Sequence, residues 1–213
     1  MSLSRLLLAV PLLLATACAS PGSAHAGDAT VQAPAAAEGQ AVAVFAGGCF
    51  WCMETAYEGK PGVISVLSGY TAGEIEGPTY KQVSSGATKH AEAVRVLYDP
   101  KVISYGELVD IFWHNIDPTQ KNGQFCDRGK QYRSALYPAN DEERDIANKT
   151  RAQAQKTLGK VVVTEIEPLA PFWVAEEYHQ DFYKKEPTHY QRYRLGCGRD
   201  ARLAELWGKA PKH

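Results

Sequence analysis

One junction constrains the fold of this chain more than any other feature. Residues Val42 to Ala46 are apolar and end at Gly47-Gly48, a pattern that predicts a buried strand. The next segment, Cys49 to Tyr57, is rich in helix formers and is followed by Gly59 and Pro61, which predicts a helix. A cysteine therefore stands where a strand passes through two glycines into a helix.

The rest of the chain interleaves further strands with helices. We expect strands at 63–67, 90–98, 132–137 and 161–166. We expect helices at 104–115, which begins with the capping box Ser104-x-x-Glu107, and at 140–158, 176–185 and 200–207. This order predicts an α/β or α+β fold in which helices pack on one mixed sheet.

The N-terminal residues have the composition of an export signal. In Met1 to Ala17 one cation precedes an apolar run that is too short to span a bilayer. The signal ends either by cleavage after Ala26, which completes a small-x-small pattern, or by lipidation of Cys18, which follows a sequence similar to a bacterial lipoprotein box. We therefore expect a protein of the bacterial cell envelope, either periplasmic or lipid-anchored to the membrane and facing the periplasm.

The segment that follows the signal contains few large apolar side chains. Residues 18–40 consist mainly of Ala, Gly, Pro, Ser and polar residues, so they cannot bury enough surface to offset the entropy of ordering. We expect a flexible linker at 18–40 and one folded domain at 41–209.

Charge and cysteine content exclude several classes of protein. The chain has 23 Lys and Arg against 24 Asp and Glu, a formal charge of −1, and a nucleic-acid-binding protein needs a basic surplus. Five cysteines are too few for a disulfide scaffold in a chain of this length. Cys126 and Cys197 are isolated and the histidines are scattered, so we expect no metal site.

The position of Cys49 indicates a reactive thiol. Unpaired N–H groups and the dipole at a helix N-terminus stabilise an anion, which predicts a lowered thiol pKa and a nucleophile near neutral pH. Cys49-Phe50-Trp51-Cys52 is also a C-x-x-C motif, so a thiol–disulfide oxidoreductase that uses Cys49 and Cys52 is an alternative function.

Gly47-Gly48-Cys49-Phe50-Trp51-x-x-Glu54 resembles the signature of the peptide methionine sulfoxide reductase A family. The resemblance extends over Ala41 to Gly208 through a series of short motifs in the same order: Ser68-Gly69-Tyr70, Pro78-Thr79-Tyr80, His90 to Val94, Asp127-Arg128-Gly129, Gln131 to Ser134 and Glu177 to Gln180. It implies a ferredoxin-like α+β fold, with helices packed on a mixed sheet and long irregular loops. It also implies an oxidoreductase that repairs the S epimer of methionine sulfoxide in proteins, one enzyme serving each epimer.

The resemblance also implies a role for individual residues. Cys49 would attack the sulfoxide sulfur, releasing methionine and leaving a sulfenic acid. Phe50 and Trp51 would hold the substrate methyl group, and Glu92 would protonate the sulfoxide oxygen. Tyr80 and Tyr132 would be the phenolic partners of that oxygen, and Asp127 would hold the hydrogen-bond network of the site.

For Glu92 the residue pattern gives independent support. On a strand at 90–98, Glu92 shares a face with Val94 and Val96, while Arg95 points the other way. A carboxyl group on an apolar face should have a raised pKa and can serve as a general acid.

The resemblance implies that a second cysteine resolves the sulfenic acid as a disulfide. Cys197, between Gly196 and Gly198, matches the position of the family's C-terminal resolving cysteine. Cys52 is the second candidate and Cys126 the last. A thioredoxin-type donor would then reduce the disulfide, with no bound cofactor, and we expect a monomer.

Overall fold

The computed structural model describes residues 30–208. The strands are β1 Val31–Gln32, β2 Ala41–Gly47, β3 Val63–Thr71, β4 Ala91–Tyr98, β5 Gly123–Gln124, β6 Asp127–Arg128, β7 Ser134–Leu136, β8 Glu165–Ile166 and β9 Phe172–Val174. The α-helices are α1 Phe50–Tyr57, α2 Tyr80–Ser84, α3 Tyr105–Trp113, α4 Asp141–Leu158, α5 Phe182–Lys185, α6 Pro187–Gly196 and α7 Arg199–Trp207. Two 3₁₀ turns lie at Lys130–Tyr132 and Glu177–His179.

The strands form a seven-stranded sheet in the order β1-β9-β3-β4-β2-β7-β8. Along the chain, β2, α1, β3, β4, α3 and β7 form a βαββαβ unit, and its four strands lie antiparallel in the order β3-β4-β2-β7. This is the ferredoxin-like arrangement, and the parallel pairing of β7 with β8 makes the sheet mixed. The predicted α+β class and ferredoxin-like core are confirmed.

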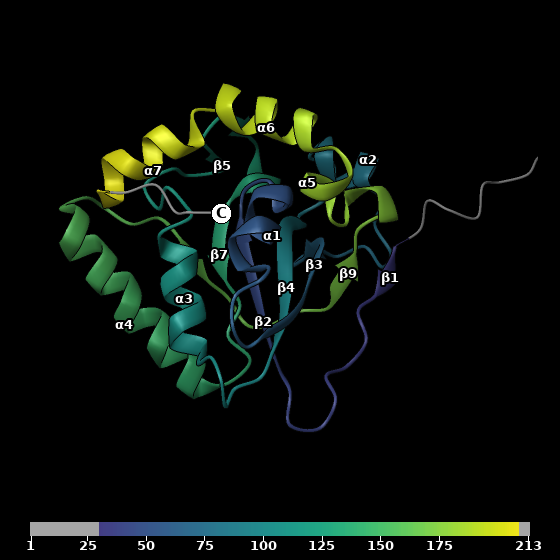
Figure 1. The fold of residues 1–213 in the computed structure, drawn as a ribbon, viewed down its shortest axis with the longest axis horizontal. Helices are drawn as coiled ribbons and strands as arrows, with labels where there is room; N and C mark the ends of the chain where they lie inside the picture. Colours follow the sequence, from purple (N-terminus) through teal and green to yellow (C-terminus); the bar gives the residue numbers. More distant parts are fainter. Residues whose placement is uncertain (1–29, 209–213) are drawn as a thin grey trace, which may run out of the picture.

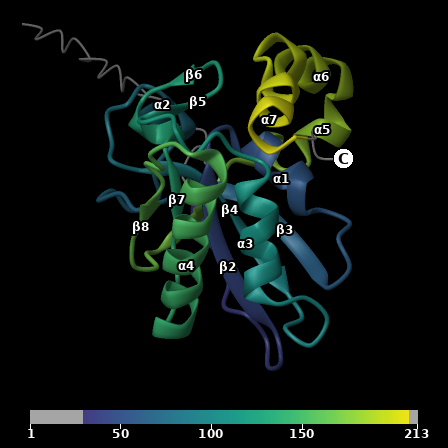
Figure 2. The ribbon, with the colours of Figure 1, turned by 90° about the vertical axis from the view of Figure 1, so that its left-hand side faces the viewer.

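Two hydrophobic clusters hold the layers together. Helices α1 and α3 lie on one face of the sheet with α4 beside α3, and they enclose the larger cluster, which includes Phe45, Tyr57 and Phe112 (Figures 1 and 2). A smaller cluster, which includes Val44 and Phe172, lies on the opposite face. Helices α5 to α7 lie across the end of the sheet where β2 meets α1, and this is where the site is found (Figure 1).

Local sequence rules explain where several helices begin and end. Ser104 caps α3, and its capping box with Glu107 is formed as predicted. Asn140 caps α4 through the N–H of Glu143, and α4 ends at Gly159, whose φ of +60° suits glycine. These are contacts between residues close in sequence, so they could be predicted from it.

Two predicted elements differ from the structure, and two helices were not predicted. The strand expected at 161–166 pairs only at Glu165–Ile166, because Val163 donates its N–H to Pro118 instead. The helix expected at 176–185 is divided into the 3₁₀ turn and α5 by Asp181, whose φ is +54°. Helices α2 and α6 were not predicted.

Part of the segment expected as a flexible linker is joined to the sheet. Strand β1 pairs with β9, and Thr30 donates a hydrogen bond to the carbonyl of Pro78 at 2.8 Å. Arg95 donates to the carbonyl of Pro34 at 2.6 Å. Main-chain pairing needs no large apolar side chain, which is why composition alone did not reveal it. The predicted export signal, Cys18 and Ala26 lie outside the described residues.

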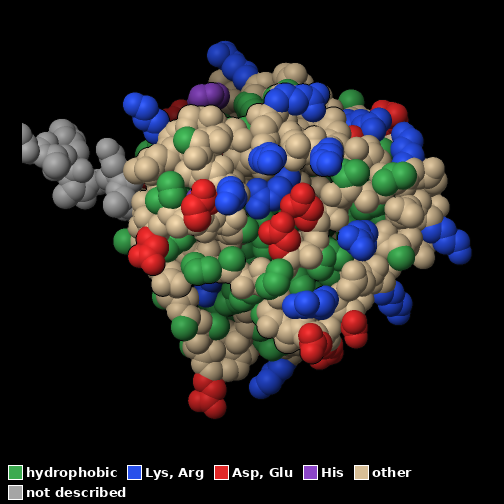
Figure 3. All heavy atoms as spheres, turned by 180° about the vertical axis from the view of Figure 1, so that it is seen from behind, with side chains coloured by type: hydrophobic (Ala, Val, Ile, Leu, Met, Phe, Trp, Pro, Cys, Tyr) green, Lys and Arg blue, Asp and Glu red, His purple; other side chains and the backbone are tan. Residues whose placement is uncertain are grey.

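The described surface carries both charge signs. On the face behind the view of Figure 1, Lys and Arg side chains are interspersed with Asp and Glu side chains (Figure 3). Within residues 30–208, no helix is long and apolar enough to cross a membrane.

Candidate active site

A cavity of about 230 Å³ lies at the junction of β2 and α1. Its lining contains all seven residues that the sequence analysis assigned to catalysis and substrate binding, together with two from α6: Cys49, Phe50, Trp51, Tyr80, Glu92, Asp127, Tyr132, His189 and Tyr193. These residues come from segments far apart in the sequence, so the fold brings the predicted set together in one place.

Two glycines allow the strand to turn into the helix. Gly48 has a φ of +82°, and a Cβ there would lie 2.5 Å from Cβ of Gln124. A Cβ on Gly47 would lie 2.4 Å from Sδ of Met53. The close approach leaves Cys49 as the N-cap residue of α1, with its side chain 6% exposed. The thiol therefore lies at the start of a helix and at the edge of the cavity.

Glu92 is the acid of the site. It lies on β4, is 2% exposed, and accepts a hydrogen bond from the N–H of Phe50 at 3.2 Å. Burial raises the pKa of its carboxyl to about 8, and the negative charges of Asp127 and Cys52 contribute. The predicted raised pKa is confirmed, so this carboxyl carries a proton near neutral pH.

The two cysteines of the C-x-x-C motif share a hydrogen bond through their thiols. Burial raises the pKa of Cys49, opposite to the prediction made from its place at a helix N-terminus, and the neighbouring Cys52 and Glu92 raise it further. The pKa of Cys52 is lowered by its hydrogen bond with Cys49 and by the charges of Arg199 and Arg194. Both shifts favour Cys52 over Cys49 as the thiol that ionises first.

Trp51 forms an aromatic wall of the cavity. Its ring stacks on Phe182 with centroids 3.7 Å apart, and Tyr193 meets it edge-on at 5.7 Å. The indole N–H donates to Nδ1 of His179 at 3.1 Å. Burial lowers the pKa of His179 to about 4, so the imidazole is neutral and can accept this bond. Trp51 is thus held in one orientation beside Phe50.

The polar side of the cavity is made of neutral phenols and a carboxyl group. Burial raises the pKa of Tyr80 to about 12, and it also raises the pKa of Tyr132, so both remain hydroxyl donors. Asp127 accepts a hydrogen bond from the hydroxyl of Tyr193, and burial raises its pKa. An oxygen atom placed among these groups would meet several hydrogen-bond donors.

His189 and Tyr193 were missed because their helix was not predicted. Helix α6 begins with Pro187, which suits the first turn of a helix, and carries Tyr190 and Tyr193 three residues apart on one side. The proline and the spacing of the two tyrosines are the sequence features from which helix α6 could have been predicted.

The other two described cysteines form a disulfide between Cys126 and Cys197, with their Cα atoms 4.9 Å apart. From the sequence, Cys126 is the last of the resolving candidates, and Cys197 is expected to resolve the sulfenic acid on Cys49. Instead, Cys197 is bonded to Cys126, while Cys49 and Cys52 are free and buried. The disulfide joins the end of α6 to the loop beside Asp127, and Cys126 is exposed.

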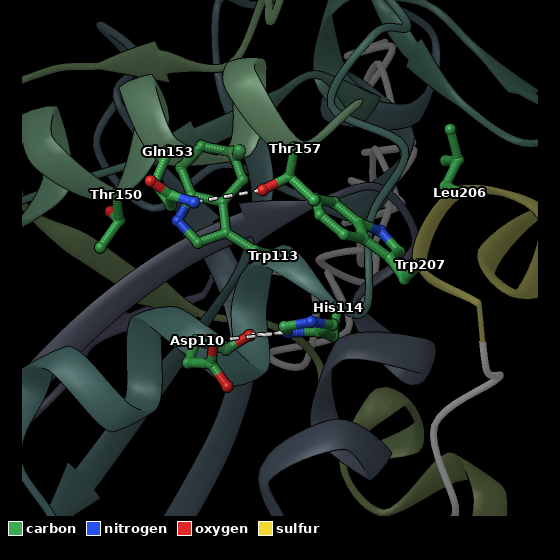
Figure 4. Close-up of a pocket in the computed structure, with 9 residues that line it drawn as sticks. Asp110, Trp113, His114, Thr150, Gln153, Thr157, Leu206 and Trp207 are labelled. Carbon is green, nitrogen blue, oxygen red and sulfur yellow. Dashed lines mark hydrogen bonds and ion pairs between the residues drawn. The ribbon is translucent and has the colours of Figure 1, made fainter. Parts of the chain in front are cut away.

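A second pocket lies away from the cysteines, between α3, α4 and α7 (Figure 4). Two of its polar side chains have hydrogen-bond partners within the pocket. The ring of His114 contacts the carbonyl of Asp110 at 2.8 Å, and Gln153 donates to Thr157 at 3.3 Å. This pocket lacks the thiol and the carboxyl group of raised pKa that the first contains.

Known proteins match the chain along most of its described length. A family model described as "Peptide methionine sulfoxide reductase" matches residues 41–211. The chain is 48% identical over 172 residues to a peptide methionine sulfoxide reductase MsrA of Bacillus velezensis, covering 80% of this chain and 97% of that protein. It is 51% identical over 167 residues to MsrA 2 of Caulobacter vibrioides, covering 78% and 85%.

Solved structures show the same fold. The reduced form of Mxr1 from Saccharomyces cerevisiae superposes with a TM-score of 0.65 at 36% identity, covering 74% of this chain and 90% of that one. Methionine sulfoxide reductase A of Corynebacterium diphtheriae also gives 0.65, at 29% identity and covering 75% and 89%. The family model, which spans residues 41–211, includes the residues that line the cavity. The chain belongs to the peptide methionine sulfoxide reductase A family.

Proposed function

We propose that this oxidoreductase reduces the S epimer of methionine sulfoxide in proteins, with Cys49 as the nucleophile. The observation that carries the proposal is the content of the cavity. A cysteine at a helix N-terminus, a carboxyl group that keeps its proton at neutral pH and an aromatic wall face one space of about 230 Å³. Sulfoxide reduction needs these three functions together: attack on sulfur, protonation of oxygen and a place for the methyl group.

The first step releases methionine. The substrate methyl group lies against Phe50 and Trp51, and its oxygen faces Glu92, Tyr80 and Tyr132. The proton that the two thiols share moves to Cys52, which leaves Cys49 as the thiolate. The Cys49 thiolate then attacks the sulfoxide sulfur. Glu92 delivers a proton to the oxygen, the sulfur–oxygen bond breaks, and the products are methionine and a sulfenic acid on Cys49.

The second step forms a disulfide. The sequence pattern favours Cys197 as the first resolving thiol, but the hydrogen bond between Cys49 and Cys52 favours Cys52. Attack by Cys52 on the sulfenic acid forms the Cys49–Cys52 bond and releases water. Thiol–disulfide exchange with reduced Cys197 and Cys126 then transfers the oxidation to the Cys126–Cys197 pair.

The external donor acts last. Cys126 is exposed, whereas Cys49 and Cys52 are buried, so the Cys126–Cys197 disulfide is the one a protein reductant can reach. We propose a thioredoxin-type donor, no bound cofactor, and oxidised proteins and peptides as substrates of a monomeric enzyme.

We propose that the enzyme works in the bacterial cell envelope. The support is the sequence of Met1 to Ala17, together with Ala26 or Cys18 as the processing point. The donor would then be a periplasmic thioredoxin-like protein, since cytosolic thioredoxin does not reach that compartment. Mass spectrometry of the mature N-terminus distinguishes a lipid on Cys18 from cleavage after Ala26, and an unprocessed, cytosolic chain would contradict the proposal.

Two assays distinguish this function from the alternative. The hydrogen-bonded pair Cys49 and Cys52 also fits a general thiol–disulfide oxidoreductase. The separate epimers of dabsyl-methionine sulfoxide should show turnover of the S epimer alone, and insulin reduction should be slow. Rapid insulin reduction without sulfoxide turnover would establish the alternative.

A further inference from the structure

Arg199 is a cation buried beside the cysteines. It is the first residue of α7, is 2% exposed, and pairs with no carboxylate among residues 30–208. Its neighbours differ: Arg194 pairs with Asp200 at 2.5 Å, and Arg202 with Asp117 at 2.7 Å. The position is also unfavourable for the helix, since a cation at a helix N-terminus opposes the macrodipole.

The contacts of Arg199 lie beside all four described cysteines. Its Nη2 donates to the carbonyl of Gly47 at 3.2 Å, two residues before Cys49, and contacts Sδ of Met53 at 3.4 Å, next to Cys52. Its guanidinium carbon lies 4.3 Å from the ring centroid of Phe125, the residue before Cys126, and Arg199 itself follows Cys197 by two residues. The remaining contact is a 2.7 Å hydrogen bond to the carbonyl of Asn115.

These contacts leave the charge of Arg199 only partly compensated. Removing a cation from water costs several kcal/mol unless it is paired, and carbonyl oxygens, a thioether and an aromatic face compensate less than an anion would. Its Nε has no hydrogen-bond partner among residues 30–208. A thiolate in the adjacent Cys49–Cys52 pair would supply the missing negative charge.

We propose that Arg199 is the counterion of the thiolate that passes between the cysteines of this enzyme. Arg199 stabilises the thiolate through the electric field of its positive charge and does not touch a reacting sulfur, so it is a positioning residue. The inference rests on the proposed function and names a component that the predicted site did not include.

The chemistry explains why one cation serves every exchange step. A thiolate of Cys197 attacks the Cys49–Cys52 disulfide, a new sulfur–sulfur bond forms, and one sulfur of the old bond leaves as a thiolate. Attack by Cys126 on the mixed disulfide releases a second thiolate in the same way. Each step consumes one thiolate and produces one, so a fixed positive charge beside all four cysteines stabilises the anion wherever it resides.

Other charged and titratable groups also face the pair. Glu92 on β4 and Asp127 on β6 are carboxyl groups whose pKa values burial raises, so both oppose a thiolate when they ionise. From α6, Tyr190, Tyr193 and Arg194 face it, and Arg194 is already paired with Asp200. Arg199 is the cation in this set without a carboxylate partner among the described residues.

The test measures thiol ionisation without using sulfoxide. The fully reduced chain is labelled with iodoacetamide over a pH series, and peptide mass spectrometry reports the rate at Cys52, the thiol of the pair whose pKa the charge of Arg199 helps to lower. The variants are Arg199→Met, which keeps length without charge, Arg199→Lys, which keeps the charge, and Arg192→Met, an exposed control on α6. Far-UV circular dichroism checks that each variant folds.

We expect the wild-type labelling midpoint to lie below the ordinary cysteine value of about 8.5. Arg199→Met should raise it by about one unit, which is roughly tenfold slower labelling at neutral pH, and Arg199→Lys should restore most of the rate. Arg192→Met should match the wild type. An unchanged midpoint in folded Arg199→Met, or a Lys variant as slow as the Met variant, would overturn the proposal.

If Arg199→Met does not fold, the wild-type midpoint still decides: a value at or above the ordinary one contradicts a thiolate stabilised by Arg199. Neither of these results alters the sulfoxide assay, so failure of this inference is distinct from failure of the proposed function.

Discussion

Replacing Glu92 by glutamine tests the proposed acid most sharply. The amide has the same shape and can still accept the N–H of Phe50, but it cannot deliver a proton to the sulfoxide oxygen. A positioned general acid contributes on the order of 10²–10⁴-fold, so the chemical step should slow by that factor while substrate binding is retained. Single-turnover release of methionine by the reduced enzyme measures the step directly.

The pH dependence gives the same substitution a second signature. With its pKa near 8, Glu92 is protonated at pH 7, so the wild-type chemical step should fall as the pH rises through about 8. This decrease in rate should be absent from the pH–rate profile of Glu92→Gln. Glu142→Gln, an exposed control on α4, should keep the wild-type profile.

The folding stability of the wild type should also fall as the pH rises. A carboxyl group whose pKa is raised from 4.5 to about 8 binds more protons in the folded than in the unfolded state between those values. Folding stability is therefore lost as the pH rises across this window, by up to about 5 kcal/mol for a shift of this size. Glu92→Gln should lack that loss, so the unfolding free energies of the two proteins should diverge towards pH 8. Turnover equal to wild type at neutral pH, with parallel stability curves, would refute the assignment.

Cys49→Ser should release no methionine in a single turnover, because a hydroxyl without an adjacent base is a poor nucleophile; turnover of more than a few per cent of wild type would mean that another thiol attacks. Cys52→Ser should release methionine once and then accumulate a sulfenic acid that dimedone traps; normal recycling would restore Cys197 as the first resolving thiol. Gly48→Ala should lower the unfolding free energy by about 1–3 kcal/mol, because φ is +82° and Gln124 blocks the Cβ, and chemical denaturation should show the loss.

The parts of the site that sequence could predict depend on local pattern. The junction of β2 and α1 follows from an apolar run, two glycines and a helix-forming segment. The raised pKa of Glu92 follows from strand alternation, since the residue shares a face with Val94 and Val96. In both cases the determining residues lie within a few positions of one another.

The parts that could not be predicted depend on distant contacts. The sign of the Cys49 pKa shift is set by burial, which helix position does not report. The bond between Cys126 and Cys197 joins residues 71 positions apart. Arg199 follows Cys197 in an unremarkable polar stretch, and only the packing of α7 against Gly47 and Asn115 reveals that it is buried.

The number of methionine molecules released per chain tests the whole account most directly. The described residues hold two cysteine pairs, Cys49 with Cys52 and Cys126 with Cys197, and each pair can be oxidised once. Fully reduced enzyme mixed with excess S-sulfoxide and no donor should therefore release two methionines per chain, and Cys49→Ser should release none. A wild-type value of one would contradict transfer of the oxidation to the second pair, and equal release by Cys49→Ser would contradict the claim that Cys49 reduces the sulfoxide.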